Sequence, residues 1–119
     1  MEPVDDVGGG TTADGDDVSW IAVAPASAIP PGDYATVEVD GALVAVFNVD
    51  GEYFAIEDVC THDGGGLAGG VVENHEVVCP RHGARFSLRS GAALTPPAYE
   101  AVRRYETRVV DGRVEVRGE

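Results

Sequence analysis

Residues 42–57 read ALVAVFNVDGEYFAIE, so two runs rich in apolar residues flank the pair Asp50-Gly51. β-Branched and aromatic residues favour strands, and Asp-Gly suits the type I′ turn, in which both central residues have positive φ. An Asp-Gly pair between two such runs is a strong local signal for a hairpin. The stretch therefore predicts a β-hairpin with strands over residues 42–49 and 52–57.

Two more Asp-Gly pairs, Asp40-Gly41 and Asp111-Gly112, continue this pattern outward from the hairpin. Together with the apolar runs beside them, they predict strands over residues 18–23, 35–39, 105–110 and 113–117. In the last of these, Val114 and Val116 alternate with charged residues and are expected to point inward. No window shows the 3.6-residue period of an amphipathic helix. The predicted fold class is all-β, a small sandwich or partial barrel of antiparallel sheets.

The composition limits the class of protein. A chain of 119 residues with 44% hydrophobic residues fits one globular domain with a modest core. The aromatic residues at strand positions are expected in the core or at its edge: Trp20, Tyr34, Phe47, Tyr53 and Phe54. The net charge is −13, and all eight basic residues are arginines. This charge argues against nucleic acid or a membrane surface as partner and suggests a high-salt cytoplasm.

The chain has no apolar run near the ~20 residues of a membrane span, and its start lacks the basic and apolar regions of a signal peptide. We therefore expect a cytoplasmic protein whose two cysteines are ligands or nucleophiles. Residues 1–17 carry six acids and no base, which predicts a disordered acidic tail before a domain over residues 18–119. Between about residues 58 and 97, glycine-rich loops and a short hairpin over 71–78 resemble an inserted, site-bearing segment.

Both cysteines and two of the three histidines lie in this segment, as Cys60-Thr61-His62 and Cys79-Pro80-Arg81-His82. Two loops of this kind can close on a metal from both sides, and thiolate with imidazole suits zinc, copper or iron–sulfur centres. A zinc knuckle, a Cys60–Cys79 disulfide and a Cys–His hydrolase each fit the two matched pairs less well. The third histidine, His75, is expected to be an exposed turn residue.

The spacing Cys-x-His, sixteen residues, Cys-x-x-His resembles the ligand signature of the Rieske family, in which two histidines and two cysteines hold a [2Fe–2S] cluster. The resemblance continues through CPRHGARFSLRSG (79–91), Leu67 with Gly70, and a proline loop at 94–97. It implies a Rieske-type fold with an inserted cluster-binding subdomain. It also implies that a [2Fe–2S] cluster is held by Cys60, His62, Cys79 and His82.

Four positions depart from the high-potential members of that family. Gly65 and Arg81 stand where those members carry two further cysteines that form a disulfide. Ala84 and Phe86 stand where they carry a serine and a tyrosine whose hydroxyls donate to sulfur. Because such hydrogen bonds raise the potential, the resemblance places this chain at the low end of the Rieske range, near about −150 mV.

The resemblance therefore implies a one-electron carrier that is not itself an enzyme. We expect a monomer that takes electrons from a flavin-dependent NAD(P)H reductase and passes them to a terminal oxygenase, with His62 and His82 at the exit edge. An electron-entry or regulatory subunit resembling the small subunit of nitrite reductase is the alternative, and a structural zinc module is a third. Arg81, Arg85 and Arg89 either steer a partner to that edge or are ordinary solvated residues.

Overall fold

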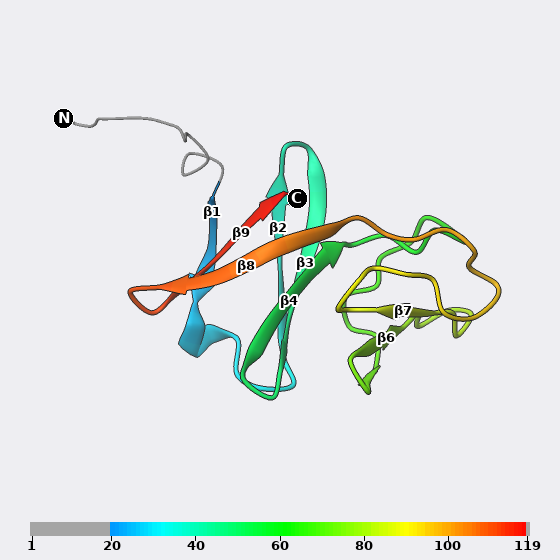
Figure 1. Ribbon diagram of the computed structural model, residues 1–119, viewed down its shortest axis with the longest axis horizontal. Helices are drawn as coiled ribbons and strands as arrows, with labels where there is room; N and C mark the ends of the chain where they lie inside the picture. The colour runs from blue at the N-terminus through cyan, green and yellow to red at the C-terminus, as the bar shows by residue number, and fades with distance from the viewer. Residues whose placement is uncertain (1–19, 119) are drawn as a thin grey trace.

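The computed structural model describes residues 20–118, which form two antiparallel sheets (Figure 1). The larger sheet has six strands in the order β1-β9-β8-β4-β3-β2, and the smaller has three in the order β5-β6-β7. The elements are β1 (Ile21–Pro25), the 3-10 helix η2 (Ala26–Ala28), β2 (Tyr34–Val39), β3 (Ala42–Val49), β4 (Glu52–Glu57), β5 (Val72–Glu73), β6 (Glu76–Val78), β7 (Arg85–Ser87), β8 (Arg104–Val110) and β9 (Arg113–Gly118). The acidic tail expected over residues 1–17 lies outside the described residues.

The three Asp-Gly pairs form the hairpin turns that the sequence predicts. Both residues of each pair have positive φ, from 51° at Asp40 to 96° at Gly51, as a type I′ turn requires. Strands β3 and β4 have the predicted bounds, whereas β1 begins and ends later than the predicted strand. Because local turn chemistry sets hairpin register, the centre of the large sheet follows directly from these pairs.

Strand β3 explains why its sequence is almost continuously apolar. Val44 and Val46 face one core, while Ala45 and Phe47 face another, and all four are buried. The first core lies inside the large sheet and includes Val114 and Val116, which confirms that these two valines point inward. A strand buried on both faces has no polar side to alternate with, so the period-2 pattern disappears.

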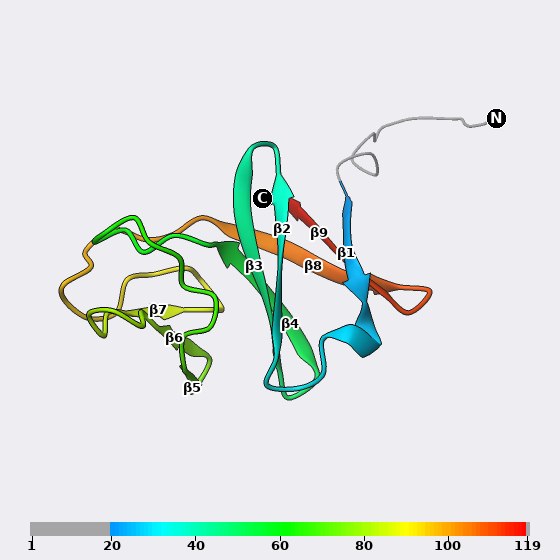
Figure 2. The same cartoon turned by 180° about the vertical axis from the view of Figure 1, so that it is seen from behind.

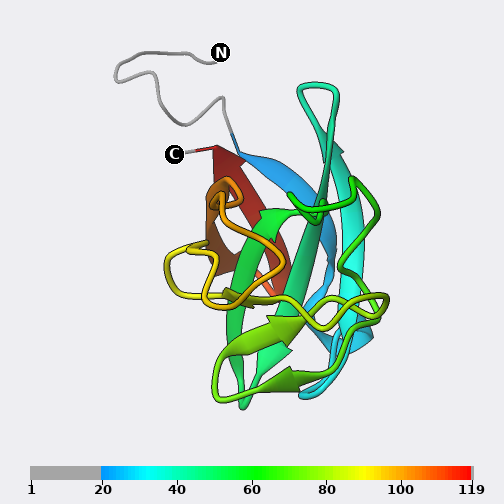
Figure 3. The ribbon, with the colours of Figure 1, turned by 90° about the vertical axis from the view of Figure 1, so that its right-hand side faces the viewer.

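The two edge strands of the large sheet, β1 and β2, contact each other, so the sheet nearly closes into a barrel. Figure 3 looks onto one end of this barrel, with the small sheet in front of it. This architecture confirms the prediction of an all-β fold of antiparallel sheets with a partial barrel. None of the helices in residues 20–118 has the length and apolar character needed to cross a membrane.

The small sheet lies beside one end of the barrel in both side views (Figures 1 and 2). The predicted hairpin in this region forms as β5 and β6, and Asn74 and His75 at its turn both have positive φ. Strand β7 was not predicted, because three residues that pair with β6 leave no periodic signal. The second core fills the space between the two sheets and contains Phe86 together with both cysteines.

The prediction for the strand aromatics is confirmed for Phe47, which is 2% exposed, and is wrong for Tyr34, which is 43% exposed. Tyr34 lies on edge strand β2, where its ring contacts Phe47 from outside at a centroid distance of 6.2 Å. Trp20 is partly buried and packs against the guanidinium groups of Arg108 and Arg117.

We expect Gly70→Ala to destabilise the protein by about 1–3 kcal/mol or more, as overpacking does. A Cβ at Gly70 would lie 2.1 Å from the carbonyl oxygen of Val78, so the backbone itself would have to move. Gly64→Asn is the control, because Gly64 has φ +79° and open space around its Cβ position, and Asn tolerates positive φ. Urea unfolding measures both variants, and equal stability of the two would refute the packing argument.

Candidate metal centre

The two cysteine loops share one backbone pattern. In the first loop, the N–H of Cys60 donates to Gly65 O (2.6 Å) and the N–H of Gly64 donates to Cys60 O (2.7 Å). In the second loop, Cys79 donates to Ala84 O (2.7 Å) and Gly83 donates to Cys79 O (3.0 Å). Gly64 and Gly83 both have φ +79°, a conformation that glycine adopts without steric cost. Each loop is thus closed on its own cysteine in the same way.

The four side chains singled out in the sequence meet where these loops face each other. Cys60 and Cys79 are buried, at 0% and 1% exposure, and both are free thiols, so the disulfide alternative is not formed. His62 and His82 lie on the outer side, exposed, with ring centroids 5.0 Å apart and planes at 90°. The donor set therefore has a buried sulfur side and an exposed imidazole side.

Backbone N–H groups face both sulfurs. Burial raises the pKa of the Cys60 thiol, although the N–H groups of His62 and Asp63 act against it. Burial acts on Cys79 too, but the N–H groups of His82 and Arg81, the Cys60 thiol and the charge of Arg81 together outweigh it, and the pKa of Cys79 is lowered. Both loops thus supply donors that stabilise negative charge on sulfur.

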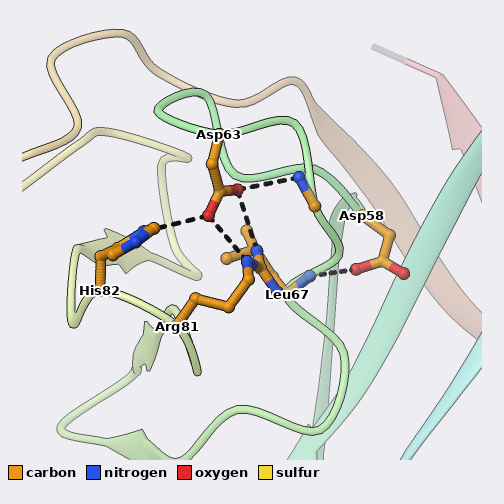
Figure 4. Close-up of polar contacts among 6 residues, drawn as sticks. Asp58, Asp63, Leu67, Arg81 and His82 are labelled. Atoms are coloured by element: carbon orange, nitrogen blue, oxygen red, sulfur yellow. Dashed lines mark hydrogen bonds and ion pairs between the residues drawn. The ribbon is translucent and has the colours of Figure 1, made fainter.

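Asp63 lies between the two pairs and contacts both loops (Figure 4). One carboxylate oxygen of Asp63 lies within 4.8 Å of both sulfurs, and one lies within 4.8 Å of a ring nitrogen of each histidine. Arg81 donates to Asp63 through Nε (2.7 Å) and Nη2 (3.1 Å). This pairing, above all, holds the pKa of Asp63 well below its usual range.

Three further hydrogen bonds attach the first loop to its surroundings. Asp58 Oδ1 accepts hydrogen bonds from the N–H group of Leu67 (2.5 Å; Figure 4) and from that of Ala68 (2.8 Å). The hydroxyl of Thr61 donates to the carbonyl of Glu100 (2.6 Å), in the segment that follows Pro96 and Pro97. That segment also places Ala98 and Val102 in the core that contains the cysteines. The first ligand loop is therefore tied both to Asp58, next to strand β4, and to the segment around Glu100.

This donor set fits a binuclear iron–sulfur group. Two adjacent buried thiols with N–H groups aimed at sulfur suit a soft, negatively charged centre, and the two imidazoles suit its outer metal. A profile of the Rieske [2Fe-2S] domain matches residues 19–106. The chain belongs to the Rieske family. As a member, it carries a Rieske-type [2Fe–2S] cluster, and it is an electron carrier, not a catalytic enzyme.

Several known proteins are similar to this chain over most of its length. The ferredoxin component of naphthalene 1,2-dioxygenase/salicylate 5-hydroxylase systems from Ralstonia sp. is 34% identical over 96 residues, 81% of this chain and 92% of that protein. A chain in the complex of reduced oxygenase and oxidized ferredoxin in carbazole 1,9a-dioxygenase has a TM-score of 0.78 at 33% identity, covering 85% of this chain and 94% of its own. A putative NADH-dependent nitrite reductase small subunit from Mycobacterium tuberculosis has a TM-score of 0.73 at 28% identity, covering 82% and 92%.

Three other residues singled out in the sequence, Arg85, Arg89 and His75, have contacts outside the four candidate ligands. Arg85 pairs with Glu73 (2.8 Å) and Glu76 (3.3 Å), and Arg89 contacts His75 Nε2 (3.2 Å). His75 lies in the predicted turn, but it is partly buried and packs against Phe54, so the expectation that it is exposed is wrong. Asp58 and Asp63 were not predicted as site residues. The opposite charges in CTHD and CPRH were the available signal for Asp63.

Proposed function

We propose that Cys60 and Cys79 ligate one iron of the [2Fe–2S] cluster and that His62 and His82 ligate the other. The observation that carries this proposal is the convergence of a buried thiol pair and an exposed imidazole pair on two loops of matching backbone. The site belongs to a domain over residues 18–119, with its cluster-binding segment at about 58–97. Such a cluster takes up and releases one electron at a time.

The chain's own residues determine where that electron leaves. The two cysteines are buried within the second core, away from solvent, whereas the side chain of His82 is 51% exposed and the ring of His62 lies against it. A partner therefore approaches closest at the histidine edge. Arg81 and Arg85 already pair with acids within the chain, and Arg89 contacts a ring nitrogen of His75, which supports the view that they are not partner-steering residues.

The partner that we propose is a terminal oxygenase. The Ralstonia relative is a component of dioxygenase systems, and the carbazole 1,9a-dioxygenase complex pairs a ferredoxin with an oxygenase. The electron donor is then a flavin-dependent NAD(P)H reductase, and the protein works as a cytoplasmic monomer. A nitrite reductase small subunit is the second candidate, supported by the Mycobacterium neighbour. This chain has a cysteine or a histidine at each of the four ligand positions, which favours an electron carrier over a nitrite reductase small subunit.

Electron transfer between purified components tests this choice. Protein reduced with dithionite and freed of excess reductant is mixed with an oxidised terminal oxygenase of a Rieske dioxygenase system, or with a nitrite reductase large subunit. We expect the visible band of the ferredoxin to reoxidise with the oxygenase, one electron per chain. Transfer to the nitrite reductase alone would establish the second candidate instead.

Two substitutions test how the site sets its potential. Ala84 and Phe86 are both fully buried in the core that contains the cysteines, and Ala84 O accepts the N–H of Cys79. We expect Phe86→Tyr to raise the reduction potential and Ala84→Ser to raise it further. A hydrogen bond worth about 1 kcal/mol more to the reduced state raises a one-electron potential by about 40 mV. Voltammetry that shows no upward shift in either variant would contradict this account of the low potential.

A further inference from the structure

The two ligand loops are joined at their outer edge by a single carboxylate. Asp63 Oδ1 accepts from the N–H of Gly65 in its own loop (2.8 Å) and from Arg81 Nη2 in the other loop (3.1 Å). Asp63 Oδ2 accepts from Arg81 Nε (2.7 Å) and lies 3.2 Å from His82 Nδ1. In residues 20–118, apart from the contact between the thiols, the hydrogen bonds and ion pairs from one ligand loop to the other all end on Asp63.

Gly65 makes room for the arginine. A Cβ at Gly65 would lie 2.5 Å from Cζ of Arg81 and under 3 Å from Nη2 and Nε, so the guanidinium occupies the space a side chain would take. Gly65 and Arg81 are therefore neighbours across the two loops. Because Gly65 leaves this space to the Arg81 side chain, the two loops are linked here by the ion pair between Arg81 and Asp63.

We propose that Asp63 and Arg81 form a clamp that holds the two ligand loops at cluster-binding separation. The two hydrogen bonds from Arg81 fix orientation as well as distance, which a single point charge would not do. Asp63 and Arg81 are positioning residues, because they act through the proposed ligands Cys60, His62, Cys79 and His82. The inference rests on that proposed ligand set.

The clamp is tested by cluster release. Asp63→Asn and Arg81→Met are compared with the wild-type protein for the rate at which an iron chelator bleaches the visible spectrum. We expect both variants to lose the cluster several-fold faster, with Arg81→Lys in between. Glu115→Gln is the matched control: the Arg108–Glu115 pair has the same 2.7 Å contact and side-chain exposures of 40% and 17%, against 38% and 19% for Arg81 and Asp63. Release from this variant should match the wild type.

The directions in which the reduction potential and the rate of cluster release change distinguish a positioning role from a purely electrostatic one. Removing the negative Asp63 or the positive Arg81 changes the local charge in opposite directions, so the reduction potential should rise in the first variant and fall in the second. A clamp predicts that cluster release is faster in both. If release is slowed in one variant and accelerated in the other, the two residues act only through their charge and the clamp is refuted.

A covalent replacement guards against variants that fail to fold. In Gly65→Cys/Arg81→Cys, oxidised glutathione should form a disulfide, and slow cluster release should return, to be lost again on mild reduction of that bond. Equal release from the oxidised and reduced forms would overturn the clamp. Wild-type release rates in Asp63→Asn and Arg81→Met would also refute it while leaving the ligand set intact. A wild-type protein without iron and sulfide would refute the ligand set itself.

Discussion

Replacing His82 with alanine is expected to abolish the [2Fe–2S] spectrum. His82 supplies one of the four donors, and the other described histidine within reach, His62, already occupies its own place at the site. Because half of the His82 side chain is exposed, its removal leaves the barrel core untouched. The measurement is iron and sulfide content with the visible and EPR spectra, and far-ultraviolet circular dichroism should stay at the wild-type level.

The third histidine provides the matched control. His75 packs edge-on against Phe54 at 5.5 Å and contacts Arg89, with no ion pair or hydrogen bond to either ligand loop in the described residues. His75→Ala should therefore keep a full complement of iron and sulfide with wild-type spectra. If His75→Ala loses the cluster and His82→Ala keeps it, the assignment of the ligands is wrong.

The second large effect is a steep rise of the melting temperature with salt. The chain carries a net charge of −13, and four described arginines are already paired with acids: Arg81, Arg85, Arg108 and Arg117. Most of the remaining acids repel one another, and the Debye length falls from ~10 Å at 0.1 M to ~3 Å at 1 M salt. For a domain of this size, each kcal/mol by which salt reduces the charge repulsion raises the melting temperature by roughly 4–8 °C.

The turn aspartates allow a control that keeps the fold. Asp40, Asp50 and Asp111 are exposed residues with positive φ, which Asn adopts equally well in a type I′ turn. Changing all three to Asn moves the net charge from −13 to −10, since three carboxylates are neutralised. The melting temperature of the variant should be higher than that of the wild type at 0.1 M salt, and it should rise less than that of the wild type when the salt is increased to 1 M. A flat melting temperature in the wild type would show that the acidity serves solubility alone.

The predictable part of this fold came from local chemistry. Asp-Gly pairs fix both φ values of a turn, so the hairpins around Asp40, Asp50 and Asp111 could be placed from the sequence. The four ligand candidates could be singled out because thiol and imidazole pairs are rare and specific. Strand β7 could not be found, since three residues are held in a sheet by pairing with β6. Its position depends on long-range contacts.

The residues that were not predicted correctly are those whose environment depends on segments distant in the sequence. Asp63 is an ordinary acid in an acid-rich sequence, and its contacts with Arg81 and His82 join residues 18 and 19 positions away. Tyr34 was expected in the core or at its edge because it is an aromatic residue at a strand position, but β2 is an edge strand of the large sheet and leaves Tyr34 43% exposed. Edge position depends on strand order, which local patterns do not encode.

The most direct measurement is the metal and sulfide content of the purified protein, read together with its EPR spectrum after reduction. The account predicts two irons and two acid-labile sulfides per chain, a red-brown colour, and a signal from a reduced [2Fe–2S] cluster with mixed cysteine and histidine ligation. A colourless protein that contains zinc and no sulfide would contradict it.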